Sequence, residues 1–397
     1  MTGVRRFSLC LLLCLMAAAP VPGNGAEPEL PQVWLVTYGP GEVYWQRFGH
    51  NAIWIREPAR GLDHVFNFGF FDFAQQDFFL RFLQGRMLYF SAAQPAQQEF
   101  AAYIDENRSI RAQRLALSPE QTTWLTGYLL EEVRPENRDY LYDYYRNNCS
   151  TRVRDAIDRA IGGDLSAASQ DVPAGQTWRD HTRRLSSSDF WLYLGLEIVL
   201  GARVDRPISR WDEMFIPEIL ADTLADTRSA SSGISAPLVL EDVMLFESTL
   251  AQPPPRPQGW WPRYLLASLA LVALGWLLSR WAGATPVRAL ARAWFATTGV
   301  AGLALLFFWF GTDHAAAGLN LNVLVLNPLW LWLGLRPGRG LRALPVVAGF
   351  SALALLLAFL PANQYTLDVL AAFLPLNLAA GAALDAGVAR RAPGLRP

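Results

Sequence analysis

One cysteine stands in the first turn of a predicted helix, where a nucleophile would be well placed. Cys149 lies in NNCSTRVRDAIDRAIGG, and apolar residues recur at helical spacing from Val153 to Ile161 until two glycines end the helix. Asn147 or Asn148 can cap this helix. Unpaired N–H groups and the helix dipole favour negative charge at such a position. We therefore expect a lowered thiol pKa and a larger thiolate fraction.

A thiol nucleophile needs a general base, and the chain offers four histidines. His50 is the best candidate among them, because it opens HNAIWI, a predicted strand whose alternation puts His50, Ala52 and Trp54 on one face. Gly49 precedes it and permits close approach of the backbone. We expect His50 to be the base that deprotonates Cys149.

A third polar group has to orient the imidazole, and the neighbouring predicted strand supplies it. In FNFGFFDF the leading choice is Asn67, with His64 and Asp72 as the alternatives. Which of them faces His50 depends on strand register, and the sequence does not determine the register.

Each of these residues also has a purely structural interpretation. A lone cysteine on the apolar face of a helix is often a small core residue. A strand histidine, likewise, is often part of a core. The pair is more informative than either residue, because a helix-start thiol and a strand histidine are the parts that a cysteine acyl-transfer site needs.

The elements that must position this site are predicted to be both strands and helices. QVWLVTY (32–38), HNAIWI (50–55) and HVFNFGF (64–70) are rich in β-branched and aromatic residues and predict strands. SPEQTTWLTGYLLEEV begins with Ser118 as N-cap and Gln121 as the partner of a capping box, which predicts a helix. FWLYLGLEIVLGA is short for a membrane span and contains Glu197, so we expect a buried or interfacial helix.

Composition and the N-terminus indicate an exported membrane protein. Of the 397 residues, 52% are hydrophobic, and residues 1–26 read as a secretory signal with Arg5 and Arg6 before an apolar run. Cys10 and Cys14 belong to this leader, which leaves Cys149 without a disulfide partner in an oxidising compartment. A formal net charge of −1 argues against nucleic acid as a partner. The cysteine and histidine spacing matches no zinc motif, so no metal or cofactor is expected.

The C-terminal third is predicted to cross the membrane five times. The candidate spans are residues 261–278, 293–310, 319–335, 344–360 and 367–383. Arginines occupy the loops after the first and third spans and the tail after the fifth, while the alternate loops contain no Lys or Arg. Because basic residues stay on the cytoplasmic side, this charge pattern puts the N-terminal domain in the periplasm.

The same patterns divide the chain into segments. We expect a signal peptide at 1–26, a periplasmic Cys/His domain at 27–250, a Pro-rich linker at 251–259, a transmembrane domain at 260–388 and a cytoplasmic tail at 389–397. Asp313 and His314 lie on the periplasmic side of the second loop and could contact a headgroup or an amine. Asn320, near the third span, is costly in lipid and is expected to face protein or a cavity, and with Asp313 and His314 it is a candidate for contact with substrate.

Four stretches of the chain resemble a known family. GPGEVYWQRFGHNAIWI, VFNFGFFDF, RPENRDYLYDYYRNNCSTRVRDAID and DEMFIPEIL are similar to the Lnb N-terminal periplasmic domain family, named after a bacterial lipoprotein N-acyltransferase. The resemblance covers residues 30–225. The order of histidine strand and cysteine helix also resembles permuted papain-like enzymes such as lecithin retinol acyltransferase. The resemblance implies Cys149 as nucleophile, His50 as base and Asn67 as the orienting residue.

Together these observations predict an α+β periplasmic domain, permuted papain-like with a small antiparallel sheet, followed by an all-α bundle of five transmembrane helices. The function expected is a cysteine-dependent acyltransferase at the periplasmic face of the bacterial inner membrane, with membrane lipids and lipoproteins as partners. The sequence leaves two alternatives open. One is an NlpC-like amidase of cell-wall peptides, and the other is a non-enzymatic envelope assembly or binding module in which Cys149 belongs to the core.

Overall fold

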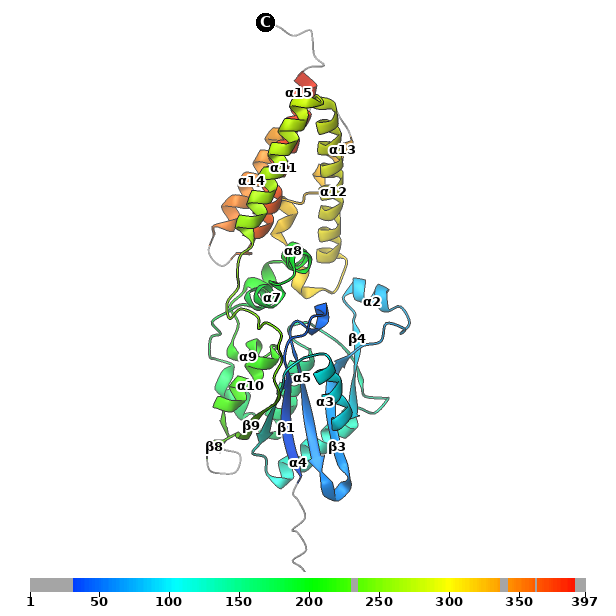
Figure 1. Ribbon diagram of the computed structural model, residues 1–397, viewed down its shortest axis with the longest axis vertical. Helices are drawn as coiled ribbons and strands as arrows, with labels where there is room; N and C mark the ends of the chain where they lie inside the picture. The colour runs from blue at the N-terminus through cyan, green and yellow to red at the C-terminus, as the bar shows by residue number, and fades with distance from the viewer. Residues whose placement is uncertain (1–30, 230–234, 336–341, 361–362, 390–397) are drawn as a thin grey trace, which may run out of the picture.

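A computed structural model describes the chain as an N-terminal α+β domain joined to a bundle of helices (Figure 1). The predicted signal peptide and residues 390–397 of the predicted tail lie outside the described residues. The described residues are 31–229, 235–335, 342–360 and 363–389.

The α+β domain is built on one sheet of seven strands in the order β6-β4-β3-β2-β1-β5-β9, with every neighbouring pair antiparallel. The predicted antiparallel sheet is thereby confirmed, and each of the three predicted strands forms. The strands of this sheet are β1 (Gln32–Tyr38), β2 (His50–Glu57), β3 (Leu62–Phe70), β4 (Leu88–Pro95), β5 (Ile110–Leu115), β6 (Asp139–Leu141) and β9 (Val239–Phe246). A separate pair is formed by β7 (Arg228–Ser229) and β8 (Ala236–Pro237).

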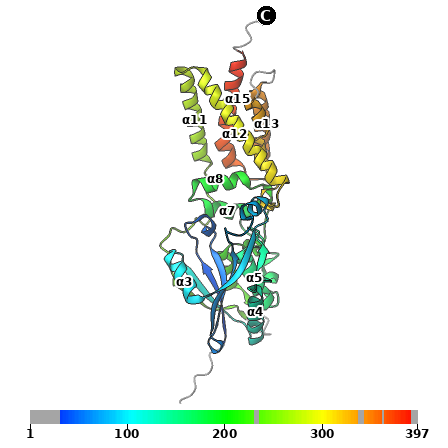
Figure 2. The same ribbon diagram turned by 90° about the vertical axis from the view of Figure 1, so that its right-hand side faces the viewer.

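Helices cover both faces of this sheet and make three layers (Figure 2). Side chains of a strand alternate between faces, so Leu35 and Ile53 pack toward α4, α5 and α10, while Val36 and Ala52 pack toward α3. Both sets are buried, which explains why the strands read as nearly continuous apolar runs. The covering helices are α3 (Ala96–Asp105), α4 (Pro119–Glu132), α5 (Cys149–Ala160) and α10 (Pro217–Asp226).

The predicted capping box of α4 is confirmed. The Ser118 hydroxyl accepts from the Gln121 backbone N–H at 3.3 Å, and the Gln121 side chain accepts from the Ser118 backbone N–H at 2.8 Å. Short helices complete the domain: α2 (Phe78–Gln84), α6 (Asp164–Ser169), α7 (Trp178–Ser186), α8 (Phe190–Val199) and α9 (Arg210–Glu213), with the 3-10 turns η1 (Tyr44–Gln46), η2 (Pro58–Arg60) and η3 (Ala202–Asp205).

Among its described residues, the C-terminal bundle contains three helices long and apolar enough to cross a membrane: α11 (Trp261–Trp281), α12 (Ala284–Phe310) and α15 (Leu367–Ala389). The predicted third span is not one continuous helix. It consists of the 3-10 turn η5 (Leu321–Leu324) and α13 (Leu329–Leu335), with Pro328, which has no N–H to donate, just before α13. The segment predicted as the fourth span forms α14 (Ala343–Ala358), which at 16 residues is shorter than a typical span. A 3-10 turn, η4 (Ala315–Ala317), follows α12.

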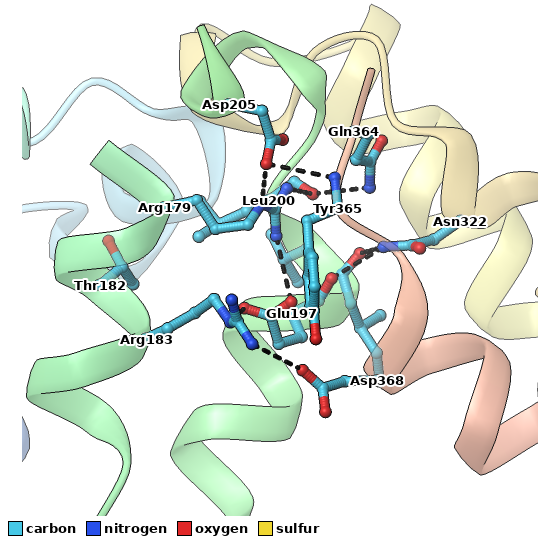
Figure 3. A network of polar contacts seen from close by, with 12 residues as sticks. Arg179, Thr182, Arg183, Glu197, Leu200, Asp205, Asn322, Gln364, Tyr365 and Asp368 are labelled. Carbon is cyan, nitrogen blue, oxygen red and sulfur yellow. Dashed lines mark hydrogen bonds and ion pairs between the residues drawn. The ribbon is translucent and has the colours of Figure 1, made fainter. Parts of the chain in front are cut away.

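Polar side chains from the bundle join it to the α+β domain at the end of α8, which lies across the bundle (Figures 2 and 3). Helix termini leave backbone carbonyls without partners inside the helix. Here the amides of Asn320, Asn322 and Gln364 donate to the carbonyls of residues 197–200 at 2.8–3.1 Å. The last turn of α8 is therefore capped by the bundle, and the two parts of the chain share one polar junction.

Buried ion pairs reinforce this junction (Figure 3). Arg179 Nε lies 2.8 Å from an oxygen of Asp205, and Arg183 Nη2 lies 3.4 Å from an oxygen of Asp368, in the first turn of α15. Asp205 also accepts from the backbone N–H of Tyr365 at 3.2 Å. Breaking such a pair leaves a buried charge without compensation, so these contacts favour one orientation of the α+β domain on the bundle.

Two glycines let the backbones of the two parts come into contact at this junction. Gly201 donates its N–H to the Ala316 carbonyl at 2.8 Å, and Ala202 donates to the Leu319 carbonyl at 3.1 Å. A Cβ built on Gly201 would lie 2.1 Å from the carbonyl oxygen of Gly318. A side chain does not fit there without moving one backbone away from the other.

We expect Gly201→Ala to destabilise the protein by about 1–3 kcal/mol, because its methyl group overpacks a contact between two backbones. The measurement is thermal unfolding of the detergent-solubilised full chain. The matched control is Gly127→Ala in α4, where a Cβ meets nothing within 4 Å and helix propensity favours alanine. Equal melting temperatures for Gly201→Ala and the unsubstituted protein would contradict this packing argument.

Candidate active site

The predicted catalytic residues meet at the end of the sheet that faces the helical bundle. β1 runs toward the bundle and ends at Tyr38, which pairs with His50 at the start of β2 (Figure 1). The loop between these strands reaches the base of α8, because Arg47 Nη1 lies 2.6 Å from the Ser188 hydroxyl. His50 therefore lies at the end of the α+β domain that faces the helical bundle.

Register selects Asn67 as the group that contacts His50. Ala52 of β2 pairs with Asn67 of β3, and His50 lies two residues from Ala52 on the same face. His50 Nε2 is 2.9 Å from Asn67 Oδ1. The alternative His64 pairs with Ile55, further along β2, and the Asp72 carboxylate accepts from the backbone N–H of Ala74.

The contacts of Asn67 determine which ring nitrogen of His50 carries the proton. Asn67 Nδ2 donates to the Val65 carbonyl at 3.3 Å and to a carboxylate oxygen of Glu99 at 2.6 Å. A carbonyl can only accept, so the amide nitrogen is on that side and Oδ1 faces His50. Nε2 must then be the protonated nitrogen, which leaves the lone pair on Nδ1. Nδ1 is the atom of His50 that can accept a proton.

Glu99 and Tyr38 form a second layer behind Asn67 that the sequence prediction missed. Glu99 is 2% exposed and accepts from the Tyr38 hydroxyl at 2.5 Å as well as from Asn67. The signal was visible in α3, where Glu99 occupies the apolar stripe with Ala96, Phe100 and Tyr103. A carboxylate on that stripe is a buried polar group that needs partners inside the domain.

Burial raises the pKa of Glu99 to about 7, although its two hydrogen bonds favour the ionised form. Because this folded-state pKa lies above the ordinary value of 4.5, folding favours the protonated carboxyl. The stabilisation from Glu99 is therefore fully present below about pH 4.5 and is lost as pH rises through 7.

We expect Glu99→Gln to remove this pH dependence, because glutamine keeps the shape and two hydrogen bonds but cannot ionise. Relative to the unsubstituted protein, the free energy of unfolding of the variant should improve by about 3 kcal/mol between pH 4.5 and pH 8. Thermal unfolding at several pH values measures this difference. Glu136→Gln, at an exposed position, is the control and should follow the unsubstituted profile. A difference that stays constant with pH would contradict the prediction.

Cys149 begins α5 beside this cluster. The N-cap is Asn148, whose side chain accepts from the Thr151 backbone N–H at 2.9 Å and is locked by donation to the Phe215 carbonyl, also at 2.9 Å. Gly69 of β3 passes close by with a φ of 95°, and a Cβ built there would lie 3.5 Å from the Cys149 Cβ. The predicted start of the helix is thus correct, with Asn148 as the cap.

The backbone N–H groups of Asn51, Ser150 and Cys149 itself act on the Cys149 thiol and lower its pKa. Asn51 follows His50 directly, so the thiol and the imidazole belong to one cluster. Among the hydrogen bonds of the described residues, none joins the sulfur to the His50 ring. Catalytic contacts of this kind are often looser before substrate binds.

The expectation of a lowered thiol pKa is wrong. Burial of Cys149 raises the pKa of its thiol, and the three N–H groups and the charge of Arg108 only reduce that rise. Burial lowers the pKa of His50 to about 4; the hydrogen bond with Asn67 opposes this fall, and the charge of Arg108 adds a smaller lowering. Both groups are therefore neutral near pH 7, and the proton must move when the sulfur attacks rather than beforehand.

Arg108 is a further residue that sequence reasoning missed. Its side chain is buried, donates to the Gly39 carbonyl at 2.9 Å, and lies over the Tyr103 ring at 4.6 Å from the centroid. The Tyr103 ring in turn stacks at 6.3 Å on His50. A buried positive charge beside the thiol would favour a thiolate or an oxyanion as it forms.

The three residues predicted to contact substrate from the membrane part lie at the domain junction. Asp313 pairs with Arg86 at 2.6 Å, and His314 Nε2 is 2.8 Å from the Phe82 carbonyl, so both contact the segment that contains α2. Asn320 is completely buried and donates both amide hydrogens to carbonyls of α8. These contacts assign them to the junction, and their role toward substrate stays a prediction.

The fold and the site define a membrane protein with a three-layer α+β domain whose cysteine, histidine and asparagine gather at the end facing the membrane helices. Residues 26–184 match the family model of the Lnb N-terminal periplasmic domain, and residues 256–337 match that of the Lnb transmembrane domain. The chain belongs to the Lnb family, with its N-terminal domain in the periplasm. No curated protein and no solved structure matches it.

Proposed function

We propose that this protein is a cysteine-dependent acyltransferase that acts on lipid or lipoprotein esters at the periplasmic surface of the bacterial inner membrane. The observation that carries the proposal is the line of contacts Glu99–Asn67–His50, which leaves a lone pair on Nδ1 of the residue that precedes Asn51, whose backbone N–H lowers the pKa of the Cys149 thiol. Membership of the Lnb family supports a lipoprotein-modifying role. The order of histidine strand before cysteine helix supports a permuted papain-like arrangement.

In the first half-reaction, the Cys149 sulfur attacks the carbonyl carbon of an acyl ester while His50 Nδ1 takes the thiol proton. The carbonyl electrons move to oxygen, and N–H groups near the start of α5, together with the charge of Arg108, stabilise that oxyanion. When the oxyanion collapses, the ester C–O bond breaks and the imidazolium returns its proton to the departing alkoxide. An acyl thioester on Cys149 and a free alcohol result.

In the second half-reaction, an amine attacks the thioester carbonyl and His50 takes the amine proton. The C–S bond breaks, and the sulfur receives the proton from His50. For a lipoprotein acceptor the amine is that of the N-terminal cysteine, and the product is an amide. Neutral resting forms of both side chains suit this sequence, because each transfer starts from an unprotonated Nδ1.

The membrane topology is part of the proposal. The arginine-rich loops support five crossings, in which the broken segment of η5 and α13 is the third and α14 is the fourth. Irregular backbone at membrane depth is tolerated where protein covers it, and Asn322, Val325 and Leu326 of the broken segment are buried. The segment boundaries predicted from the sequence, with the linker at 251–259 before α11, fit this topology.

The decisive test is intact-mass spectrometry of the purified full chain after incubation with phospholipid or with a diacylglyceryl lipopeptide. We expect a mass increase of one acyl group, located on the peptide that contains Cys149 and released by hydroxylamine. Muropeptides offered under the same conditions should yield no adduct and no cleavage. Cleavage of muropeptides, or acyl transfer without any adduct at Cys149, would overturn the proposal.

A further inference from the structure

An exposed apolar surface lies beside the candidate active site, and most of it comes from α2. This helix, FFLRFLQ, has no buried residue, and Phe79 is 74% exposed. We name the surface the aromatic lip, and its members are Trp45, Phe73, Phe79, Leu80, Phe82 and Leu83. Soluble surfaces rarely keep so many large apolar side chains together, so such a surface indicates an interaction partner.

Two segments far apart in the sequence build the lip as one surface. Trp45, in η1 of the β1–β2 loop, contacts Phe71 and Phe73 with ring centroids 5.9 and 6.1 Å apart. Phe73 contacts Phe78 at 5.0 Å, and Phe78 is followed by the exposed residues of α2. These aromatic contacts hold η1 and α2 together, so the lip is a structural unit and not a set of scattered residues.

The lip is tied to the end of a membrane span. The Asp313 backbone N–H donates to the Gln84 carbonyl at 2.8 Å, and a Cβ on Gly85 would lie 2.6 Å from the backbone nitrogen of His314. Asp313 and His314 follow within four residues of Phe310, where α12 ends. Figure 1 shows α2 beside this end of α12. The lip is thus held beside the end of α12, one of the helices long and apolar enough to cross a membrane.

The lip also continues to the thiol. Phe71 contacts Tyr89 at 5.1 Å, and Tyr89 stacks on Tyr142 at 4.3 Å. The Tyr142 ring and the Cys149 Cβ both lie within 4 Å of a Cβ built on Gly69. A series of aromatic rings therefore leads from the lip to Tyr142, and Gly69 lies between the Tyr142 ring and Cys149.

We propose that the aromatic lip inserts into the periplasmic leaflet of the bilayer that the bundle spans, and that lipid acyl chains reach Cys149 along it. Short helices with aromatic and leucine side chains bind the interfacial region of bilayers, where tryptophan is also enriched. The attachment to the end of α12 favours the lipid leaflet over a second copy of the chain. The second part of the inference rests on the proposed acyl transfer, whereas the insertion does not.

Insertion can be tested without catalysis. A single cysteine carrying an environment-sensitive fluorophore is placed at Phe79, Leu240 or Phe310 in a Cys149→Ser chain whose leader cysteines are also serine, reconstituted in phosphatidylcholine–phosphatidylglycerol vesicles. Leu240 of β9 is exposed and lies between Val239 and Glu241, which pair with Leu115 and Arg114 at the end of the sheet opposite His50. Phe310, 74% exposed like Phe79, marks the end of α12. Quenching by shallow spin-labelled lipids should be similar at Phe79 and Phe310, and at least threefold stronger than at Leu240. Quenching at Phe79 that is no stronger than at Leu240 would overturn the insertion, and this is the result expected if a second copy of the chain covers the lip.

A second measurement tests the route to Cys149. In the chain with Cys149 intact, the rates of Cys149 acylation by vesicle phospholipid and by a water-soluble short-chain ester are compared for Phe79→Asp and for the control Leu240→Asp, which lies at the opposite end of the sheet. The ratio of the vesicle rate to the soluble-ester rate should fall at least tenfold for Phe79→Asp and stay unchanged for the control. An unchanged ratio for Phe79→Asp would overturn the route. If the unsubstituted protein reacts with neither donor, the proposed chemistry fails, while the quenching result still decides the insertion.

Discussion

Replacing Cys149 with alanine is expected to abolish the acyl adduct and to reduce acyl transfer by about 10⁴-fold or more. The physical reason is that alanine has no nucleophilic atom. Without the Cys149 sulfur, the His50 base has no thiol to deprotonate and no acyl thioester can form. Because the Cys149 side chain is small and is not completely buried, replacing it with alanine should leave the fold intact. The effect should therefore appear in the chemical step and not in the amount of folded protein.

The measurement combines turnover with intact-mass analysis of the full chain in lipid. Cys149→Ser nearly keeps the volume and tests whether an oxygen can replace the sulfur. We expect this variant to be nearly as inactive, because a hydroxyl is far less acidic than a thiol and gives up its proton less readily. Arg159→Ala, exposed on the same helix, is the matched control and should retain activity. Normal turnover in a well-folded Cys149→Ala protein would place Cys149 in the core and end the proposed mechanism.

Replacing His50 with alanine is expected to reduce acyl transfer by about 10³–10⁴-fold near pH 7. Burial keeps the thiol protonated, with a pKa above its ordinary value of 9.0, so without a base at hand very little thiolate forms. The residual rate of His50→Ala should rise about tenfold per pH unit as hydroxide takes over deprotonation. The unsubstituted protein should show no such rise around neutrality, since the pKa of His50 is already lowered to about 4.

His64→Ala is the matched control for this prediction. His64 lies on the adjacent strand of the same sheet, but it pairs with Ile55, and it is Asn67 that contacts the His50 ring. We expect its turnover and pH profile to follow those of the unsubstituted protein. Equal losses in His50→Ala and His64→Ala, each with a lowered melting temperature, would indicate that both changes act through stability and that His50 is not the base.

The site and the membrane part are coupled in this structure through elements that carry no catalytic residue. The capped end of α8 and the Gly201 contact set the height of the sheet domain above the bundle. The Asp313 and His314 contacts hold α2 at the same height on the other side of the site. A lipid ester group remains at the bilayer surface, so a thiol that is to reach it must be held there as well.

The β-branched and aromatic runs and the N-cap and capping-box residues were enough to predict β1, β2 and β3, together with α4 and the start of α5. They place Cys149 in a first helical turn and His50 at the start of a strand, because these are local properties of spacing and capping. Loop arginines likewise indicate which side of the membrane each end occupies.

Register, burial and long-range contacts required the tertiary structure. The pairing of Ala52 with Asn67 chose the partner of His50, since strand register depends on packing across the sheet. The pKa of Cys149 rises because other segments cover it, which outweighs the local effect of the helix start. Glu99 becomes part of the site only when α3 packs on the sheet. In each of these cases the deciding interaction energy comes from residues far away in the sequence, which local patterns cannot specify. The starts of helices and strands depend instead on residues only a few positions away.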